Sequence, residues 1–192
     1  MLRKMLTVGA IAMTIAAGSA SADDTELHQP WDDILGTYVV ESDDGLNRFD
    51  YGGLQANAED SAKLDAYLES FANLDFDTLS EDEQFAAYSN IYNALTIQHI
   101  VGRYPTKSIR SGYIVGPWKR VFTTVDGEEV SLDDLEHGIL RVQFSDPRVH
   151  YAVNCASYGC PNLRTDAWFG ATLDEELDDA ARDFINNPRG VT

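Results

Sequence analysis

The chain has 192 residues, with 32 acidic side chains against 14 basic ones and a formal net charge of −18 at pH 7. Such a surface repels phosphate backbones and anionic lipid headgroups, which argues against nucleic acids and membrane surfaces as partners. The length is that of one domain with a single hydrophobic core.

Residues 1–22 have the pattern of a secretory signal peptide. The basic pair Arg3-Lys4 precedes the apolar stretch MLTVGAIAMTIAAG, and small residues end in the cleavage-site pattern Ala20-Ser21-Ala22. The stretch is too short to span a membrane stably, and no cysteine follows it that would carry a lipid. We therefore expect cleavage after Ala22, no membrane anchor, and a periplasmic or secreted protein. Residues 23–192 form the expected single domain, whose oligomeric state the sequence leaves open.

The first half of this domain predicts helices behind an irregular start. Residues 23–58 are rich in Asp, Gly and Asn, which indicates a lead-in of short strands and turns. The apolar spacing over 59–74 predicts an amphipathic helix. A capping box at Ser80–Glu83 begins a second, longer helix, and Tyr104-Pro105 ends it.

The second half adds strands. Residues 120–130 predict a hairpin around Asp126-Gly127, and a helix over 132–144 follows. Residues 149–154 have the apolar character of a partly buried strand, and Thr172 is the expected cap of a last helix. Because strands and helices are mixed without regular βαβ alternation, the sequence predicts an α+β fold, with helices packed on a small, mostly antiparallel sheet.

The two cysteines, Cys155 and Cys160, are open to several interpretations. Cysteines this close in an oxidising compartment invite a disulfide, but closing so short a loop stabilises by about 2 kcal/mol at most, which favours a chemical role over a structural one. Their spacing matches no zinc motif, so we predict neither a metal nor another cofactor. The small residues after Cys155 favour a loop that exposes a nucleophilic thiol and offers amides to an oxyanion. In a redox pair, Cys155 would attack and Cys160 would resolve.

His137 is the candidate base for such a thiol. It lies beside Glu136 in a predicted helix that leads directly to the cysteine segment, so packing can bring the imidazole to Cys155 and lower the thiol pKa. Glu136 or an asparagine of the 90–93 pair would orient the ring, and the alternative for His137 is an exposed helix histidine. His150, five residues from Cys155 in an extended strand, points to the opposite face as a partly buried strand residue. His99 has the spacing of a core-edge residue.

Asn90 and Asn93 lie three residues apart inside the long predicted helix. Asparagine is a poor residue for a helix interior because its amide competes for backbone hydrogen bonds. Two of them indicate side chains that hold another loop or a polar site, and a structural clamp is the favoured reading. With Arg141, Asn154 and Cys160, they are the candidate binding residues.

Three segments resemble the motifs of a bacterial and plant family called domain of unknown function 547. In order, they are NIYNALTIQHIVGRYPTKSI, SLDDLEHGILR and DPRVHYAVNCASYGCPNL, and the resemblance runs from about residue 85 to residue 187. It implies that the following residues occupy family motif positions: Asn90, Tyr92, Asn93, Glu136, His137, Arg141, Cys155 and Pro161. Cys160 matches a position that is cysteine in many bacterial members and serine in plant relatives, which favours Cys155 as the functional sulfur. The resemblance also implies that the C-terminal part of the family domain is missing.

We therefore expect an exported domain with a Cys155–His137 thiol site. It would cleave or transfer an amide or thioester on a peptide-like or thiol-bearing small molecule, in a papain- or transglutaminase-like fold of permuted order. The first alternative is a non-catalytic periplasmic binding or interaction module with a Cys155–Cys160 disulfide, in which Glu136, His137, Arg141 and the two asparagines form a polar network. A thiol redox protein is the second alternative.

Overall fold

The computed structural model describes residues 20–188 and residue 190. Residues 1–19, most of the predicted signal peptide, lie outside the described residues. The helices are α1 (Ala20–Tyr38), α2 (Tyr51–Ala56), α3 (Ala58–Ser70), α4 (Glu81–Val101), α5 (Arg141–Gln143), α6 (Val149–Ala152) and α7 (Leu173–Asn186). Shorter turns are the 3₁₀ elements η1 (Phe71–Asn73), η2 (Phe76–Thr78) and η4 (Gly170–Thr172), and η3 (Asp134–Leu140) is a π-helix.

The strands form two separate antiparallel hairpins. β1 (Val39–Glu41) pairs with β2 (Asn47–Phe49), and β3 (Phe122–Val125) pairs with β4 (Glu128–Ser131). The α+β class and the antiparallel pairing are confirmed. Because each hairpin is small, helices rather than a sheet supply most of the core.

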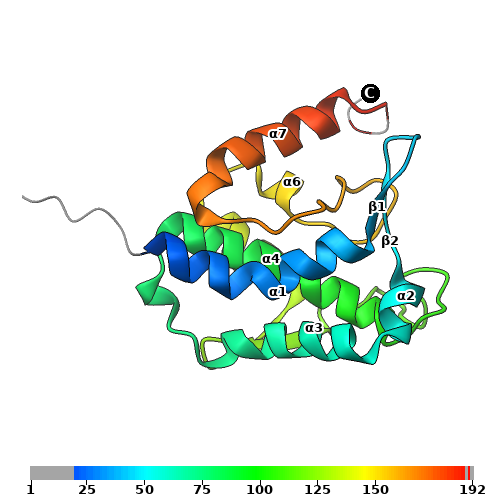
Figure 1. The fold of residues 1–192 in the computed structure, drawn as a ribbon, viewed down its shortest axis with the longest axis horizontal. Helices are drawn as coiled ribbons and strands as arrows, with labels where there is room; N and C mark the ends of the chain where they lie inside the picture. The colour runs from blue at the N-terminus through cyan, green and yellow to red at the C-terminus, as the bar shows by residue number, and fades with distance from the viewer. Residues whose placement is uncertain (1–19, 189, 191–192) are drawn as a thin grey trace, which may run out of the picture.

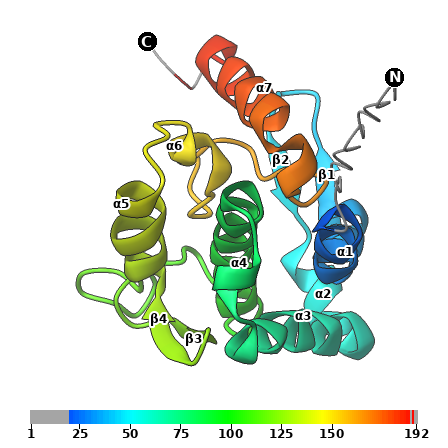
Figure 2. The ribbon, with the colours of Figure 1, turned by 90° about the vertical axis from the view of Figure 1, so that its left-hand side faces the viewer.

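Helix α4 runs through the middle of the molecule, with the other elements arranged around it (Figures 1 and 2). It packs against α1, α2, α3, η3 and η4. Its side chains are buried on every face from Phe85 to Ile97, as expected of a helix enclosed by others. The predicted capping box is confirmed, since Ser80 N donates to Glu83 Oε2 at 2.7 Å and Glu83 N donates to Ser80 Oγ at 3.3 Å.

The predicted hairpin is also confirmed, and its tip shows why it forms. Asp126 and Gly127 both have positive φ, 49° and 77°, which is the backbone that a two-residue type I′ turn needs. Their amides donate to the carbonyls of Phe71 and Ala72 at 2.9 and 2.8 Å. The tip is therefore fixed to η1, directly after α3.

The predicted irregular lead-in is wrong for residues 51–56, which form α2, and for its first part, because α1 continues to Tyr38. Four of its side chains, spaced as on one helix face, are buried in the core: Trp31, Ile34, Leu35 and Tyr38. Pro30, which lies inside the helix, and the many aspartates conceal this pattern in the sequence. The expectation of short strands and turns holds for residues 39–50.

The predicted strand over 149–154 is also wrong, because the segment begins with the helical turn α6. Asp146 Oδ1 accepts a hydrogen bond from Arg148 N at 2.8 Å and starts the turn. Val149, Ala152 and Val153 are buried, with the spacing of one helical turn. His150 is consequently exposed rather than partly buried, and the argument from strand alternation does not apply to it.

The last two predicted helices form, with different starts. The helix expected over 132–144 is π-helical from Asp134 to Leu140 before it becomes α5, and π-helical turns are frequent at functional sites. Helix α7 begins at Leu173, but Thr172 makes no capping bond and donates instead to Glu176 Oε1 at 2.9 Å. Among the described residues, no helix combines the length and apolar character needed to cross a membrane.

Candidate functional site

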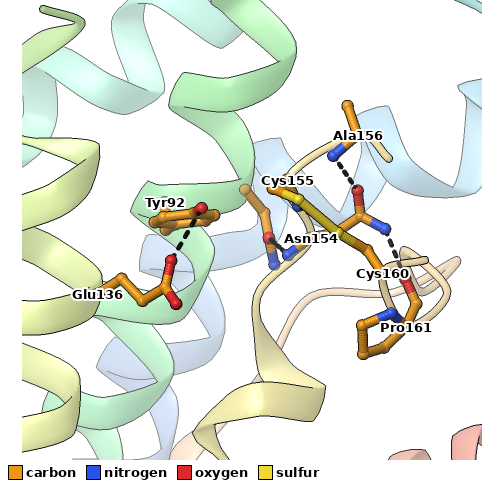
Figure 3. The surroundings of a disulfide bond; sticks show 8 residues. Tyr92, Glu136, Asn154, Cys155, Ala156, Cys160 and Pro161 are labelled. Atoms are coloured by element: carbon orange, nitrogen blue, oxygen red, sulfur yellow. Dashed lines mark hydrogen bonds between the residues drawn. A yellow bond between two sulfur atoms is a disulfide. The ribbon is translucent and has the colours of Figure 1, made fainter. Parts of the chain in front are cut away.

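The sulfurs of Cys155 and Cys160 form a disulfide across a short loop (Figure 3). Asn154 organises this loop: its Nδ2 donates to the Pro161 carbonyl at 2.6 Å, and its Oδ1 accepts from Ala156 N at 2.7 Å. Ala156 has φ +56°, so the chain turns sharply after the first cysteine. Cys155 N donates to the sulfur of Cys160 at 3.3 Å. In this state Cys155 is not a thiol.

Asn93 attaches the disulfide loop to the central helix. Its Nδ2 donates to the Ala152 carbonyl at 2.9 Å, and its Oδ1 accepts from Asn154 N at 2.7 Å. The side chain is only 3% exposed. A single amide therefore satisfies one acceptor and one donor of the chain directly before Cys155, as a neighbouring β-strand would.

Asn90 makes the same pair of bonds one turn earlier. Its Nδ2 donates to the Trp168 carbonyl at 2.8 Å, and its Oδ1 accepts from Trp168 N at 3.0 Å. Trp168 Nε1 donates to the Ala152 carbonyl at 3.1 Å, which links the two clamps. Both asparagines thus hold another segment of the chain, and for Asn93 that segment carries the candidate nucleophile. Their predicted role in binding stays a prediction.

Glu136 lies in the surroundings of the disulfide, on η3, together with Tyr92 of α4 (Figure 3). Tyr92 Oη donates to Glu136 Oε2 at 3.2 Å. Burial, and then the charge of Glu136, raise the pKa of Tyr92, so the phenol is a neutral donor at ordinary pH. His137 Nδ1 is 3.6 Å from Glu136 Oε1, and the histidine side chain is 53% exposed. This separation is longer than a hydrogen bond, so the orienting role of Glu136 stays a prediction.

The pair and the disulfide border different cavities. Glu136 and His137 line a cavity of about 360 Å³ with Trp118 and Lys119. Cys160 lines another, of about 420 Å³. Glu136 and His137 thus open to the same cavity, and neither lines the cavity that Cys160 borders. The roles predicted for Cys155, His137 and Glu136 in catalysis stay predictions.

The remaining candidates lie farther from this centre. Arg141 is exposed at the end of η3 and has no ion pair with a described carboxylate. His99 is half-buried, as expected of a core-edge residue, and its Nε2 is 3.4 Å from Tyr113 Oη. Burial, and then the charge of Arg103, lower the pKa of His99.

The cavity beside Cys160 has a second wall that sequence reasoning missed. This wall is β2 and the start of α2, with Asn47, Phe49 and Tyr51 facing the cavity. Asn47 N donates to Asn162 Oδ1 at 3.1 Å, and Asn47 Nδ2 donates to the Leu163 carbonyl at 2.8 Å, so the two walls are joined. The sequence signal for this wall was a short β-prone stretch after Gly45. That stretch does not reveal the cavity, because the residues it contacts, Asn162 and Leu163, lie more than a hundred positions away.

Comparison with known proteins identifies a family but no individual relative. No curated protein and no solved structure matches the chain. The likeness to papain or transglutaminase therefore stays a prediction. Residues 76–185, which include α4, the Glu136–His137 pair and both cysteines, match a family described as "Protein of unknown function, DUF547". The match covers more than half of the chain, and the protein belongs to this family.

Proposed function

We propose that this protein is exported and is a binding module for extended, peptide-like ligands. The observation that carries the proposal is that an outward strand edge and the disulfide loop are two walls of one cavity of about 420 Å³. That volume is within the range of small-molecule and peptide sites. The Cys155–Cys160 disulfide is also the feature that the sequence analysis associated with a non-catalytic binding module.

The strand edge supports a peptide rather than a compact ligand. In antiparallel pairing, alternate residues turn their N–H and C=O groups toward the partner strand. Asp50 N donates to the Tyr38 carbonyl at 2.8 Å, toward β1, whereas Asn47 N donates away from it, to Asn162. Phe49, which has the same parity as Asn47, therefore directs its backbone groups to the cavity side. An extended peptide can pair with such an edge as an added strand.

The opposite wall is held in place before any ligand arrives. The disulfide, Asn154 and Asn93 fix the loop, and preorganisation of this kind reduces the entropy lost on binding. The cavity lining includes the rings of Phe49, Tyr51 and Tyr158, and Tyr158 is 73% exposed. Burial raises the pKa of Tyr51 to about 12, so this ring presents a neutral hydroxyl. Aromatic side chains beside a strand edge suit apolar peptide side chains.

Titration of isotope-labelled protein with capped tetrapeptides, followed by amide NMR shifts, tests the proposal. We expect the largest shifts at Phe49 and Ser157, which line the cavity. N-methylation of alternate peptide amides removes the donors needed for strand pairing and should weaken binding at least about tenfold. Equal binding of methylated and unmethylated peptides would contradict the proposal.

Two variants locate the site on the protein. Tyr158→Ala removes an exposed ring of the cavity wall and should weaken peptide binding. Val142→Ala removes a side chain that is 70% exposed elsewhere on the surface and should leave binding unchanged. Shifts that cluster away from Phe49 and Ser157, or that survive Tyr158→Ala unaltered, count against this cavity as the site.

A second candidate function is thiol-dependent amide or thioester cleavage after reduction of the disulfide. The observation that favours it is the presence of Glu136, hydrogen bonded by Tyr92 and adjacent in sequence to His137, in the surroundings of the sulfurs. The Cys155 thiolate would form the acyl–sulfur bond, the amine or thiol would leave with a proton from the imidazolium, and water would release the acid. This chemistry requires a free Cys155.

Alkylation of the reduced protein by iodoacetamide tests this candidate, with Cys160→Ser present so that one thiol reacts. An activated thiol would alkylate with an apparent pKa well below about 8.5, and His137→Ala would restore the ordinary value. His150→Ala, which alters an exposed histidine, is the matched control. A reaction with an ordinary pKa that is indifferent to His137 eliminates the thiol mechanism and leaves the binding module.

A further inference from the structure

The positive charge of this acidic protein is concentrated in one connection. No acidic residue occurs from Gln84 to Val125, and five of the 14 basic residues of the chain fall between 103 and 120. These five are Arg103, Lys107, Arg110, Lys119 and Arg120, and all of them are exposed. The connection between α4 and β3 is thus a basic segment on a molecule that is otherwise strongly negative.

The same connection carries the most exposed apolar side chains. Ile114 is 98% exposed and its neighbour Val115 is 77% exposed, while Phe122 just beyond is 47% exposed. Figures 1 and 2 show that the connection projects from the helical body as a loop. Single exposed apolar residues are ordinary on a protein surface. A protruding pair such as Ile114 and Val115, flanked by cations, is unusual and indicates an interaction site.

The loop is a defined structure. Gly116 has φ +94°, and a Cβ there would overlap the ring of Trp118, so this turn admits only glycine. Arg103 donates to the Ser111 carbonyl and lies 5.0 Å from the centre of the Tyr113 ring. Ile109 is 6% exposed and anchors the loop in the body. The apolar pair is therefore held outward.

Most of the cations are not neutralised by the protein itself. Lys119 pairs with Asp133 at 3.3 Å. Lys107, Arg110 and Arg120 make no ion pair with any carboxylate in the described part of the chain. Their charge is therefore available to an outside partner.

We propose that the loop of residues 103–122 docks the protein on an anionic membrane surface, with Ile114 and Val115 inserted among the lipid chains. Lys and Arg side chains hold their charge at the headgroup level while apolar neighbours enter the interface. The net charge of −18 argues against membrane surfaces for the molecule as a whole. At physiological salt, however, charges are screened beyond about 8 Å, and Asp133, a carboxylate beside the loop, already pairs with Lys119. An acidic protein partner would satisfy the cations, but it would not account for two nearly fully exposed aliphatic side chains at the tip.

Co-sedimentation with lipid vesicles tests the proposal. The full chain should bind vesicles that contain phosphatidylglycerol and should bind pure phosphatidylcholine vesicles at least about tenfold more weakly. Binding should decrease as salt rises, since exposed charges are screened. Equal binding to both vesicle types, or no binding to the anionic ones, would overturn the proposal.

Paired variants separate the loop from the rest of the surface. Lys107→Gln and Arg110→Gln should each weaken binding to anionic vesicles about fivefold, and Ile114→Ser with Val115→Ser about tenfold. Arg182→Gln and Val142→Ser alter exposed residues elsewhere and should have little effect. Loop variants that bind like the wild type contradict the proposal. Light scattering on the same samples detects the rival outcome, in which the basic loop binds acidic copies of the chain and no vesicles.

Discussion

Asn93 joins the central helix to the disulfide loop through one side-chain amide, and its loss should be costly. Asn93→Ala leaves the Asn154 amide without the partner it has in the structure, whereas the Ala152 carbonyl keeps its hydrogen bond from Trp168 Nε1. Each buried unpaired group costs about 1–3 kcal/mol. We expect the free energy of unfolding, measured with urea, to fall by about 1–3 kcal/mol.

The control for this variant is Asn186→Ala. Asn186 Nδ2 also donates to a carbonyl, that of Arg182 at 2.8 Å, but on the exposed side of α7. Its loss should change the free energy of unfolding by no more than about 0.5 kcal/mol. If the two variants are equally stable, burial of the clamp is not what makes Asn93 important.

Tyr92 should make the free energy of unfolding of the wild type decrease at alkaline pH. The raised pKa of Tyr92 means that the folded protein keeps the phenolic proton after the unfolded chain begins to lose it. Stability from this group is fully present below the unfolded pKa, about 10, and declines as pH rises above it. Urea unfolding between about pH 8 and pH 11 should therefore show the wild type losing stability faster than Tyr92→Phe.

Below that range the two proteins should differ by a constant amount. The hydrogen bond to Glu136 is then intact in the wild type, and its absence in Tyr92→Phe should cost about 1 kcal/mol. Tyr51 and Tyr67, whose pKa values are also raised by burial, titrate in both proteins and cancel in the comparison. Curves that remain parallel to pH 11 are inconsistent with a buried, neutral Tyr92.

At the level of elements, two similar sequence signals have different structural outcomes. Ser80 and Thr172 are each followed three residues later by glutamate, yet only Ser80 forms the capping box. Thr172 donates to Glu176 instead. We expect Ser80→Ala to lower the free energy of unfolding by about 1 kcal/mol and Thr172→Ala by less than half of that. Thermal unfolding of both variants checks this, and an equal cost would mean that Thr172 caps α7 in solution.

Elements with purely local signals were predictable from the sequence. The helix over 59–74, helix α4 and the Asp126-Gly127 hairpin depend on spacing, caps and turn residues within a few positions. Segment 149–154 was not predictable in this way, because a short apolar run has no period that separates a strand from a turn of helix. Its conformation follows from Asp146 and from burial beneath other elements.

The candidate site depends on contacts that are distant in sequence. The clamp role of Asn93 was inferred from its poor fit to a helix interior, but its partners, Ala152 and Asn154, are about sixty residues away. The Cys155–Cys160 pairing was one of several options that spacing alone left open. The cavity needs β2 and the disulfide loop together, and no local pattern relates residues 47 and 162.

For the whole molecule, an excess of negative charge should make stability depend on salt. With 32 acidic and 14 basic side chains, most carboxylates have no cation to pair with, and their mutual repulsion opposes the compact state. Added salt screens exposed charges over about 8–10 Å at physiological strength. We therefore expect the free energy of unfolding at neutral pH to rise as sodium chloride increases from about 20 mM to about 300 mM.

The same series of salt concentrations, measured near the isoelectric point, provides the control. At the sequence pI of about 4.3 the net repulsion disappears, so salt has only the individual ion pairs to weaken, such as Arg148 with Asp146 and Asp178. The salt effect on stability should there become flat or negative. A positive slope of equal size at both pH values would attribute the effect to preferential exclusion of salt rather than to charge. Vesicle binding by the basic loop should change in the opposite direction with salt at neutral pH, because there the screened interaction is an attraction.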